Sequence, residues 1–220
     1  MTNSTCLIDN FLDEKTALYL WNYFQIQDFS FINGVEWRKV YRLQDGNPLR
    51  GPSFEFEFSE KSVGNDKDIY FFINNFIRHN QKIQSFFKDK IEKFHVSLNA
   101  FPAGTALSWH KDGRCKGAFI YYVHPVWGAH WGGELLVAEG KNSALPIGKK
   151  YVSESEQKIV PPAFDPSHDN RCLLEEAHGR YFMAKPNRLI LLKPNTNHMV
   201  KPVTNSAGAH MRCSISGFFY

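Results

Sequence analysis

The sequence lacks the features of membrane, secreted and thiolate-metal proteins. Its four cysteines are widely spaced and form no CxxC pair, so neither a thiolate zinc site nor a disulfide framework is expected. No window approaches the ~20 consecutive apolar residues that a membrane span needs. The chain opens on a polar, uncharged stretch, and we therefore expect no secretory leader. These absences predict a protein that works in the reducing cytoplasm without a membrane partner.

No repeat, low-complexity segment or charge run divides the 220 residues, and this length suits one domain, 1–220. Lys and Arg number 26 against 22 Asp and Glu, giving a formal charge of +4. Because these charges are mixed along the chain, they do not favour nucleic acid as a partner. Aromatic residues make up 15% of the chain, which is typical of strand-rich cores and ligand pockets.

Amphipathic helices are predicted in the first part of the chain. Asp13 is a candidate N-cap for a helix over residues 13–24, whose apolar residues recur with helical spacing at Ala17, Leu20, Trp21 and Phe24. Two further stripes follow, at Ile69, Phe72, Ile73, Phe76 and Ile77, and at Ile83, Phe86 and Phe87. We interpret residues 1–92 as a helical support region.

From Lys93 the spacing of apolar residues changes from 3.6 to 2, which predicts a half-buried strand over 94–101. Turn residues separate further predicted strands at 116–123, 134–138, 188–192, 199–203 and 211–219. Helices followed by short strands indicate an α+β fold, with a β-sandwich or jelly roll as the catalytic half in 93–220. The stretch 139–187 fits no strand pattern and is interpreted as an insertion or lid.

The segment from Ser108 to Gly113 carries the central chemical signal. His110 and Asp112 are two residues apart, so in an extended segment both point to the same side. His198, much later in the chain, is the candidate third ligand. Two imidazoles and one carboxylate on one face of an octahedral ion leave three positions open, the arrangement of non-haem iron(II) oxygenases. A hydrogen-bonded core histidine is the alternative for an isolated motif of this kind.

Polar residues share one face of the predicted last strand: Arg212, Ser214 and Ser216. Placing three polar side chains inside a sandwich is costly unless they line a polar pocket. A guanidinium binds a carboxylate through two parallel hydrogen bonds, a contact worth roughly 1.5–3 kcal/mol. The pattern therefore predicts a carboxylate-binding pocket, and a polar face turned to solvent is the alternative.

Taken in order, these motifs resemble the iron(II)/2-oxoglutarate oxygenases, in particular their prolyl-4-hydroxylase-like branch. The resemblance extends over residues 98–219 and includes Gly132-Gly133-Glu134-Leu135 between the metal ligands. It implies a double-stranded β-helix (jelly-roll) core with N-terminal helices packed on one sheet. It also implies Fe(II) bound by His110, Asp112 and His198, with 2-oxoglutarate and O2 as co-substrates. Arg212, helped by Ser214, would bind the far carboxylate of 2-oxoglutarate.

The sequence departs from the branch at two tyrosine positions, which hold Phe101 and Leu107. Neither can hydrogen-bond the co-substrate, so Asn99 and Tyr121 or Tyr122 are the candidates for that role. Halogenases of the superfamily replace the carboxylate ligand with Ala or Gly. Asp112 is present here, so hydroxylation or a related oxidation is predicted in preference to halogenation.

The substrate is less constrained by the sequence. Aromatic and basic residues that flank the predicted metal strands are candidate substrate contacts: Trp109, Arg114, Tyr122 and Trp131. We expect a small molecule, such as an amino acid or a natural-product intermediate, with a peptide or protein side chain as the alternative and nucleic acid third. His124 and His130 are not predicted as ligands, because no carboxylate accompanies them at useful spacing. A cupin-like metal protein or a jelly-roll binding module that does not use 2-oxoglutarate is the alternative from another class.

Overall fold

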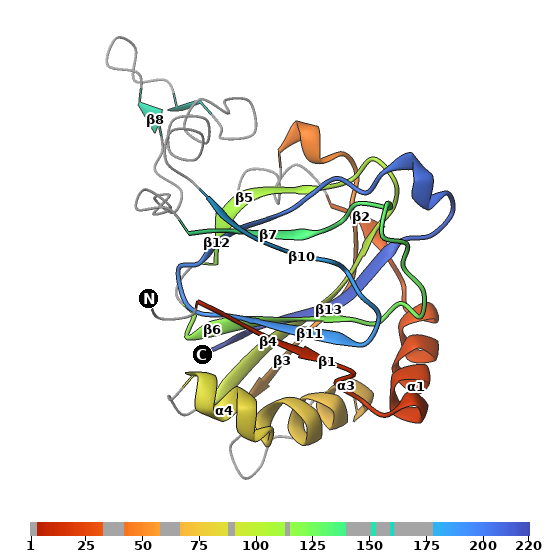
Figure 1. Ribbon diagram of the computed structural model, residues 1–220. Helices are drawn as coiled ribbons and strands as arrows, with labels where there is room; N and C mark the ends of the chain where they lie inside the picture. Colours follow the sequence, from red (N-terminus) through yellow and green to blue (C-terminus); the bar gives the residue numbers. More distant parts are fainter. Residues whose placement is uncertain are drawn as a thin grey trace.

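The computed structural model describes residues 4–32, 42–57, 67–87, 91–112, 115–139, 151–152, 159–160 and 178–220. Two antiparallel sheets face each other in a jelly-roll-like sandwich (Figure 1). The larger sheet runs in the order β1 (Thr5–Asp9), β11 (Arg188–Leu192), β6 (Gly117–Tyr122), β13 (Arg212–Phe219), β4 (Lys93–Phe101), β3 (Leu49–Glu57), β2 (Ser30–Phe31). The smaller sheet runs β10 (Gly179–Phe182), β7 (Leu135–Ala138), β12 (Asn197–Val200), β5 (Leu107–Lys111). A separate pair joins β8 (Tyr151–Val152) to β9 (Ile159–Val160).

Most of the predicted strands are confirmed, and β4, β6, β7, β11 and β13 lie within two residues of the expected bounds. The strand expected at 199–203 instead ends at Val200, since Pro202 has no N–H to donate to a ladder. Residues 1–92, interpreted as a helical support region, also contribute three strands, because β1, β2 and β3 complete the larger sheet. The register of β3 against β4 shifts between Arg50 and Ser53, around Gly51-Pro52, and this irregularity hides its alternation.

The predicted helices are present. α1 (Glu14–Gln25) begins after Asp13, whose Oδ1 accepts a hydrogen bond from the backbone N–H of Thr16 at 3.0 Å. α3 (Lys67–Phe72) continues into a turn of π-helix, η2 (Ile73–Arg78), and is followed by α4 (Gln81–Phe87). Short 3-10 turns form at η1 (Leu43–Asp45) and η4 (Asn205–Ala207). None of the helices in the described part of the chain has the length and hydropathy of a membrane-spanning segment.

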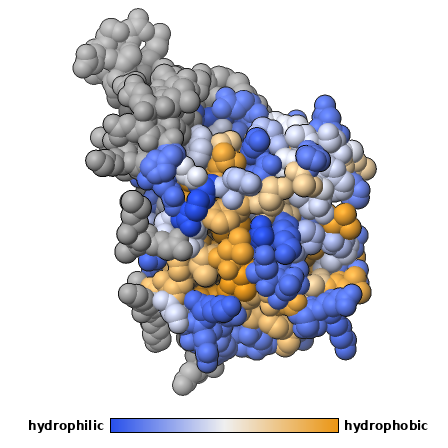
Figure 2. Space-filling view, in the orientation of Figure 1, coloured by the Kyte–Doolittle hydropathy of each residue, from blue (hydrophilic) through white to orange (hydrophobic). Residues whose placement is uncertain are grey.

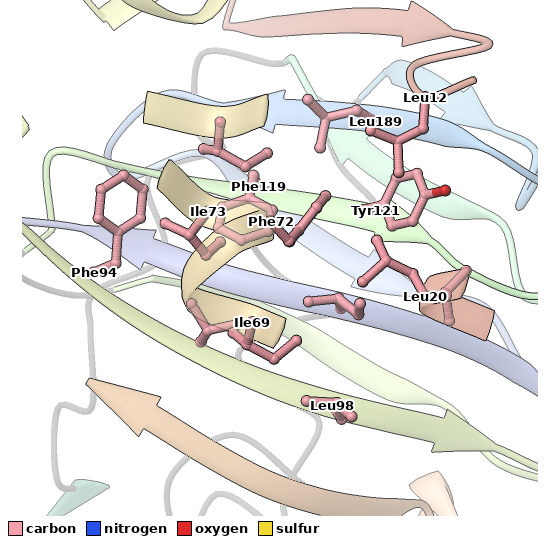
Figure 3. Packing of buried hydrophobic residues seen from close by; sticks show 14 of the residues in the cluster. Leu12, Leu20, Ile69, Phe72, Ile73, Phe94, Leu98, Phe119, Tyr121 and Leu189 are labelled. Carbon is pink, nitrogen blue, oxygen red and sulfur yellow. The ribbon is translucent and has the colours of Figure 1, made fainter. Parts of the chain in front are cut away.

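The central strands of the larger sheet are buried on both faces. On one face, helix residues such as Leu20 and Phe72 join Leu98 and Phe119 in a single hydrophobic cluster (Figure 3). On the other face, a second cluster joins Phe101 and other sheet residues to Leu135 and Val137 of the smaller sheet. The expectation of a half-buried β4 is therefore wrong, because its second face lines the space between the sheets. The surface view shows polar residues around a central apolar group (Figure 2).

Candidate active site

The three predicted metal ligands come together on the smaller sheet. His110 on β5 lies directly opposite His198 on β12, and Asp112 follows the end of β5. His110 Nε2 lies 3.8 Å from Asp112 Oδ1, and His198 Nε2 lies 3.7 Å from Asp112 Oδ2. One ligand atom from each residue falls within 4.8 Å of the others, so the three residues can hold one metal ion.

Hydrogen bonds fix which nitrogen of each imidazole faces this cluster. The Nδ1 of His110 lies 2.7 Å from the carbonyl oxygen of Ser108, and the Nδ1 of His198 lies 2.9 Å from that of Thr196. A carbonyl oxygen only accepts, so each Nδ1 carries the proton and each Nε2 keeps its lone pair for a metal. This support of metal-binding histidines through the second ring nitrogen fits a metal centre.

The electrostatic environment keeps His110 neutral. Burial, together with the neighbouring His198, lowers the pKa of His110 to about 4, although the carboxylate of Asp112 acts in the opposite direction. A metal ligand must be deprotonated, and the depressed pKa provides a neutral imidazole at neutral pH.

A buried carboxylate that the sequence analysis missed supports β5. Asp45, in η1, accepts hydrogen bonds from the backbone N–H of Ser108 at 3.1 Å and from its hydroxyl at 2.7 Å. It also accepts from the backbone N–H of Arg42 at 2.8 Å. Since the Ser108 carbonyl holds His110, Asp45 positions the strand that carries the first ligand. Its only sequence signal is an acidic residue in a turn, which is too common to be informative.

A cavity of about 150 Å³ lies between the sheets and connects the metal cluster to Arg212. Ser214 and Ser216 of β13 also line it, opposite Asn99 and Ser97 of β4. The Nδ2 of Asn99 donates to Ser216 Oγ at 2.8 Å and to the Ser97 carbonyl at 3.3 Å. The polar face of the last strand is thus turned inward, and the solvent-facing alternative is wrong.

Arg212 is 2% exposed and is held by neutral groups. Its Nε donates to the Gly133 carbonyl at 2.7 Å, and its Nη2 donates to the Tyr122 hydroxyl at 3.1 Å. The guanidinium carbon also lies 4.8 Å from the Tyr122 ring centroid and 5.6 Å from that of Phe101. Within the described residues no carboxylate pairs with Arg212. A buried cation without a counter-charge is costly, so this site is suited to an anionic ligand.

The absence of a side chain at Gly133 leaves space for the side chain of Arg212. The residue has a φ of +70°, and a Cβ atom there would lie 2.8 Å from Arg212 Cδ. Gly132, with a φ of +73°, would place a Cβ 2.2 Å from the Pro202 carbonyl oxygen. The glycine pair between the metal ligands is therefore required by backbone conformation and by close approach.

The sequence profile of the family described as the 2OG-Fe(II) oxygenase superfamily matches residues 96–220. The chain belongs to this superfamily. The resemblance noted in the sequence is thus confirmed, and the enzyme is a 2-oxoglutarate-dependent dioxygenase that uses Fe(II), 2-oxoglutarate and O2. The superfamily assignment replaces the alternatives of a cupin-like protein and of a binding module.

Solved structures agree with this assignment at the level of the fold. A prolyl-4-hydroxylase from Pseudomonas putida is similar with a TM-score of 0.63 and 15% identity, over 99% of this chain and 93% of that chain. A 2OG-Fe(II) oxygenase family oxidoreductase from Burkholderia pseudomallei gives 0.61 and 11%, over 98% and 84%. A Trichoplax adhaerens prolyl hydroxylase, in complex with a peptide fragment of the hypoxia inducible factor oxygen degradation domain, gives 0.55 and 18%, over 100% and 84%. The sequence matches no curated protein.

Tyr121 of the oxygenase lies on the face of β6 that is turned away from the cavity. Tyr121 belongs to the helix-side cluster, where its hydroxyl donates to Asn187 Oδ1 at 3.2 Å and burial raises its pKa (Figure 3). The prediction that Tyr121 contacts the co-substrate is wrong, because neighbouring strand residues point to opposite faces. Tyr122 is the tyrosine of β6 that faces the interior, and it contacts Arg212.

Two of the residues predicted to contact the substrate of the oxygenase, Trp109 and Trp131, do not line the cavity. Trp109 does not line the cavity, since it alternates with His110 along β5. Trp131 stacks on His210 at 4.5 Å and lies 5.3 Å from Trp127 instead of lining the cavity. Arg114 and residues 140–150, 153–158 and 161–177 of the predicted lid lie outside the described residues.

His124 is enclosed by the fold of the oxygenase. It is 3% exposed, and both ring nitrogens are hydrogen-bonded within the fold. Burial lowers its pKa to about 4, although the backbone groups of Ala184 and Cys213 beside the ring act in the opposite direction. His124 therefore stays neutral at pH values where an exposed histidine is protonated.

This shift predicts a loss of stability in mild acid. In the unfolded chain His124 takes up a proton near pH 6.5, and in the native state only near pH 4, so protonation favours unfolding as pH falls between these values. The expected contribution is at most roughly 3 kcal/mol of unfolding free energy. Urea unfolding across this window should show a shallower pH dependence for His124→Gln than for wild type. Equal slopes would contradict a neutral, buried His124.

Proposed function

We propose that the enzyme hydroxylates an unactivated C–H bond of a small molecule. His110, Asp112 and His198 hold Fe(II), and Arg212 holds the far carboxylate of 2-oxoglutarate. The observation that carries this proposal is one cavity lined both by the three-residue cluster and by a buried arginine that lacks a counter-charge in the described structure. Bound Fe(II) supplies the activation of O2 that couples breakdown of the co-substrate to oxidation of the substrate.

The chain's own residues bind and orient the co-substrate. The contacts of Arg212 with Gly133 and Tyr122 fix the guanidinium plane before ligand binding, so a carboxylate meets a preorganised donor pair. Ser214 lies two residues further along the same face and supplies a hydroxyl donor. Asn99, opposite Ser214 in register, lines the cavity and orders its polar wall through Ser216.

A small substrate suits the described cavity. Beside the metal cluster, apolar walls from Leu107, Leu135 and Val200 face a polar wall that includes His95 and Ser97. An amino acid or a natural-product intermediate presents both kinds of surface. The alternative substrate is a peptide or protein side chain. It draws support from the Trichoplax adhaerens relative, whose structure holds a peptide. We further propose that residues 1–220 form one catalytic domain, in which the N-terminal helices support the larger sheet, and that it acts in the cytoplasm.

Succinate production tests the substrate class. Purified enzyme with Fe(II) and 2-oxoglutarate is incubated with free amino acids, other small metabolites, or short peptides carrying the same side chains. We expect small molecules to stimulate succinate formation and to gain one oxygen atom by mass spectrometry, with Asp112→Ala as the inactive control. Stimulation by peptides alone would overturn the small-molecule proposal while leaving the oxygenase assignment intact.

Adjacent tyrosines provide a matched pair of variants for the co-substrate pocket. Tyr122→Phe removes the hydroxyl that accepts from Arg212, and the Kd for 2-oxoglutarate should rise about three- to tenfold, as for one lost hydrogen bond. Tyr121→Phe removes a hydroxyl on the opposite face and should leave this Kd unchanged. Anaerobic titration of the Fe(II) enzyme measures both constants. A larger effect at Tyr121 would contradict the assigned orientation of β6.

A further inference from the structure

His124 lies just beyond β6 and is hydrogen-bonded on both sides of its ring. Its Nδ1 accepts from the backbone N–H of Cys213 at 3.0 Å and also lies 2.9 Å from the carbonyl oxygen of that residue. Its Nε2 lies 2.8 Å from the carbonyl oxygen of Ala184. The Ala184 carbonyl can only accept, so the neutral ring carries its proton on Nε2 and leaves Nδ1 to accept from the Cys213 N–H. The ring thus ties the last strand to the turn that precedes β11.

The hydrogen bond between the Cys213 N–H and His124 lies next to Arg212 in the chain. Cys213 follows Arg212 on β13, and its N–H belongs to the peptide group that links the two residues. Holding this peptide fixes the backbone from which the arginine side chain extends. Since the guanidinium is reached through several rotatable bonds, the direction of its stem sets where the charge lies in the cavity.

His124 also contacts the rings of Tyr122 and Trp127, which lie beside the hydrogen-bond partners of the Arg212 guanidinium. The His124 ring centroid lies 5.8 Å from that of Tyr122 and 5.0 Å from that of Trp127. Tyr122 accepts from Arg212 Nη2, and Trp127 Nε1 donates to the Gly132 carbonyl at 3.1 Å. The next carbonyl, of Gly133, accepts from Arg212 Nε. His124 therefore packs against the residues that support both ends of the guanidinium.

We propose that His124 is a positioning residue that aligns Arg212 for the far carboxylate of the co-substrate. It thereby sets the selectivity for a 2-oxo diacid over a 2-oxo monoacid. The inference rests on the proposed role of Arg212. It follows from three contacts that converge on one side chain: the Cys213 peptide, the Tyr122 ring and the Trp127 ring. His124 touches no substrate atom and takes part in no proton transfer.

Two ligands separate this role from a purely structural one. 2-Oxoglutarate and 2-oxopentanoate share the metal-chelating 2-oxo acid, but only the first has the carboxylate that Arg212 reads. We expect His124→Phe to raise the Kd for 2-oxoglutarate about tenfold, the equivalent of one or two lost hydrogen bonds, and to change that for 2-oxopentanoate less than twofold. Anaerobic titration of the Fe(II) protein gives both constants.

Two polar variants test which contact matters and keep the proposal falsifiable if the phenylalanine variant does not fold. Asn at 124 offers an oxygen where Nδ1 accepts from Cys213, and Gln offers an N–H where Nε2 donates to Ala184. His124→Asn should recover more of the selectivity than His124→Gln. His210→Phe is the control, since His210 is exposed and stacks on Trp131 without contacting Tyr122 or Cys213.

The outcomes distinguish this inference from the proposed function. If the His124 variants lower the melting temperature but weaken both ligands equally, or neither, His124 is only structural and the inference is overturned. Equal selectivity of the asparagine and glutamine variants would also contradict a role through Cys213. If wild-type Fe(II) protein fails to bind 2-oxoglutarate, the proposed function itself is wrong.

Discussion

Replacing Arg212 with methionine is expected to leave Fe(II) binding intact and to raise the Kd for 2-oxoglutarate by about a hundredfold or more. The buried guanidinium has no counter-charge among the described residues, so the bound carboxylate is its charge partner. Removing one member of a buried, hydrogen-bonded charge pair costs about 2–5 kcal/mol. Anaerobic titrations with iron and then with 2-oxoglutarate separate the two constants.

Arg212→Lys tests geometry at constant charge and should give an intermediate Kd, because an ammonium cannot make two parallel hydrogen bonds to one carboxylate. Arg188→Met is a suitable control. Arg188 also lies on the larger sheet, but its ion pair is with Asp9, at 2.6 Å, away from the cavity. Unchanged affinity of Arg212→Met for 2-oxoglutarate would show that the far carboxylate binds elsewhere.

The second large effect is expected at the metal centre, where His198→Ala should abolish stoichiometric Fe(II) binding. The three ligand atoms lie within 4.8 Å of one another, and removing one leaves a bidentate site. Losing only an outer partner of a metal ligand costs about 10–100-fold in affinity, so losing a ligand itself should cost more. Equilibrium dialysis with Fe(II) under anaerobic conditions measures the affinity.

His130→Ala is the matched control, because His130 is exposed and lies outside the metal cluster. It should bind iron like wild type. Asp45→Asn should give a smaller loss of iron affinity, since Asp45 acts on His110 only through Ser108. Full iron binding by His198→Ala would exclude the assigned ligand set.

Features that depend only on the spacing of neighbouring residues were predicted correctly from the sequence. The spacing of His110 and Asp112 predicted that both side chains share a face, and the helical spacing around Leu20 and Phe24 predicted α1. Bringing His198 opposite His110 depends on the pairing of β12 with β5. No local pattern encodes that register, so the sequence made His198 a candidate third ligand without placing it opposite His110.

The errors also have physical causes. β6 is buried on both faces, so its sequence shows no alternation that would tell Tyr121 from Tyr122, and a shift of one residue reverses every side chain. Asp45 and His124 act through contacts with residues far along the chain, and such contacts leave no periodic signal. β3 was missed because its register shift interrupts the alternation.

The most direct test of the account is the anaerobic visible absorption spectrum of the protein titrated first with Fe(II) and then with 2-oxoglutarate. Chelation of iron by a 2-oxo acid produces a metal-to-ligand charge-transfer band and requires no knowledge of the substrate. The band should appear with one equivalent of each, be lost in His198→Ala and need much more 2-oxoglutarate in Arg212→Met. Iron binding without the band, or a band unchanged in both variants, would contradict the assigned site.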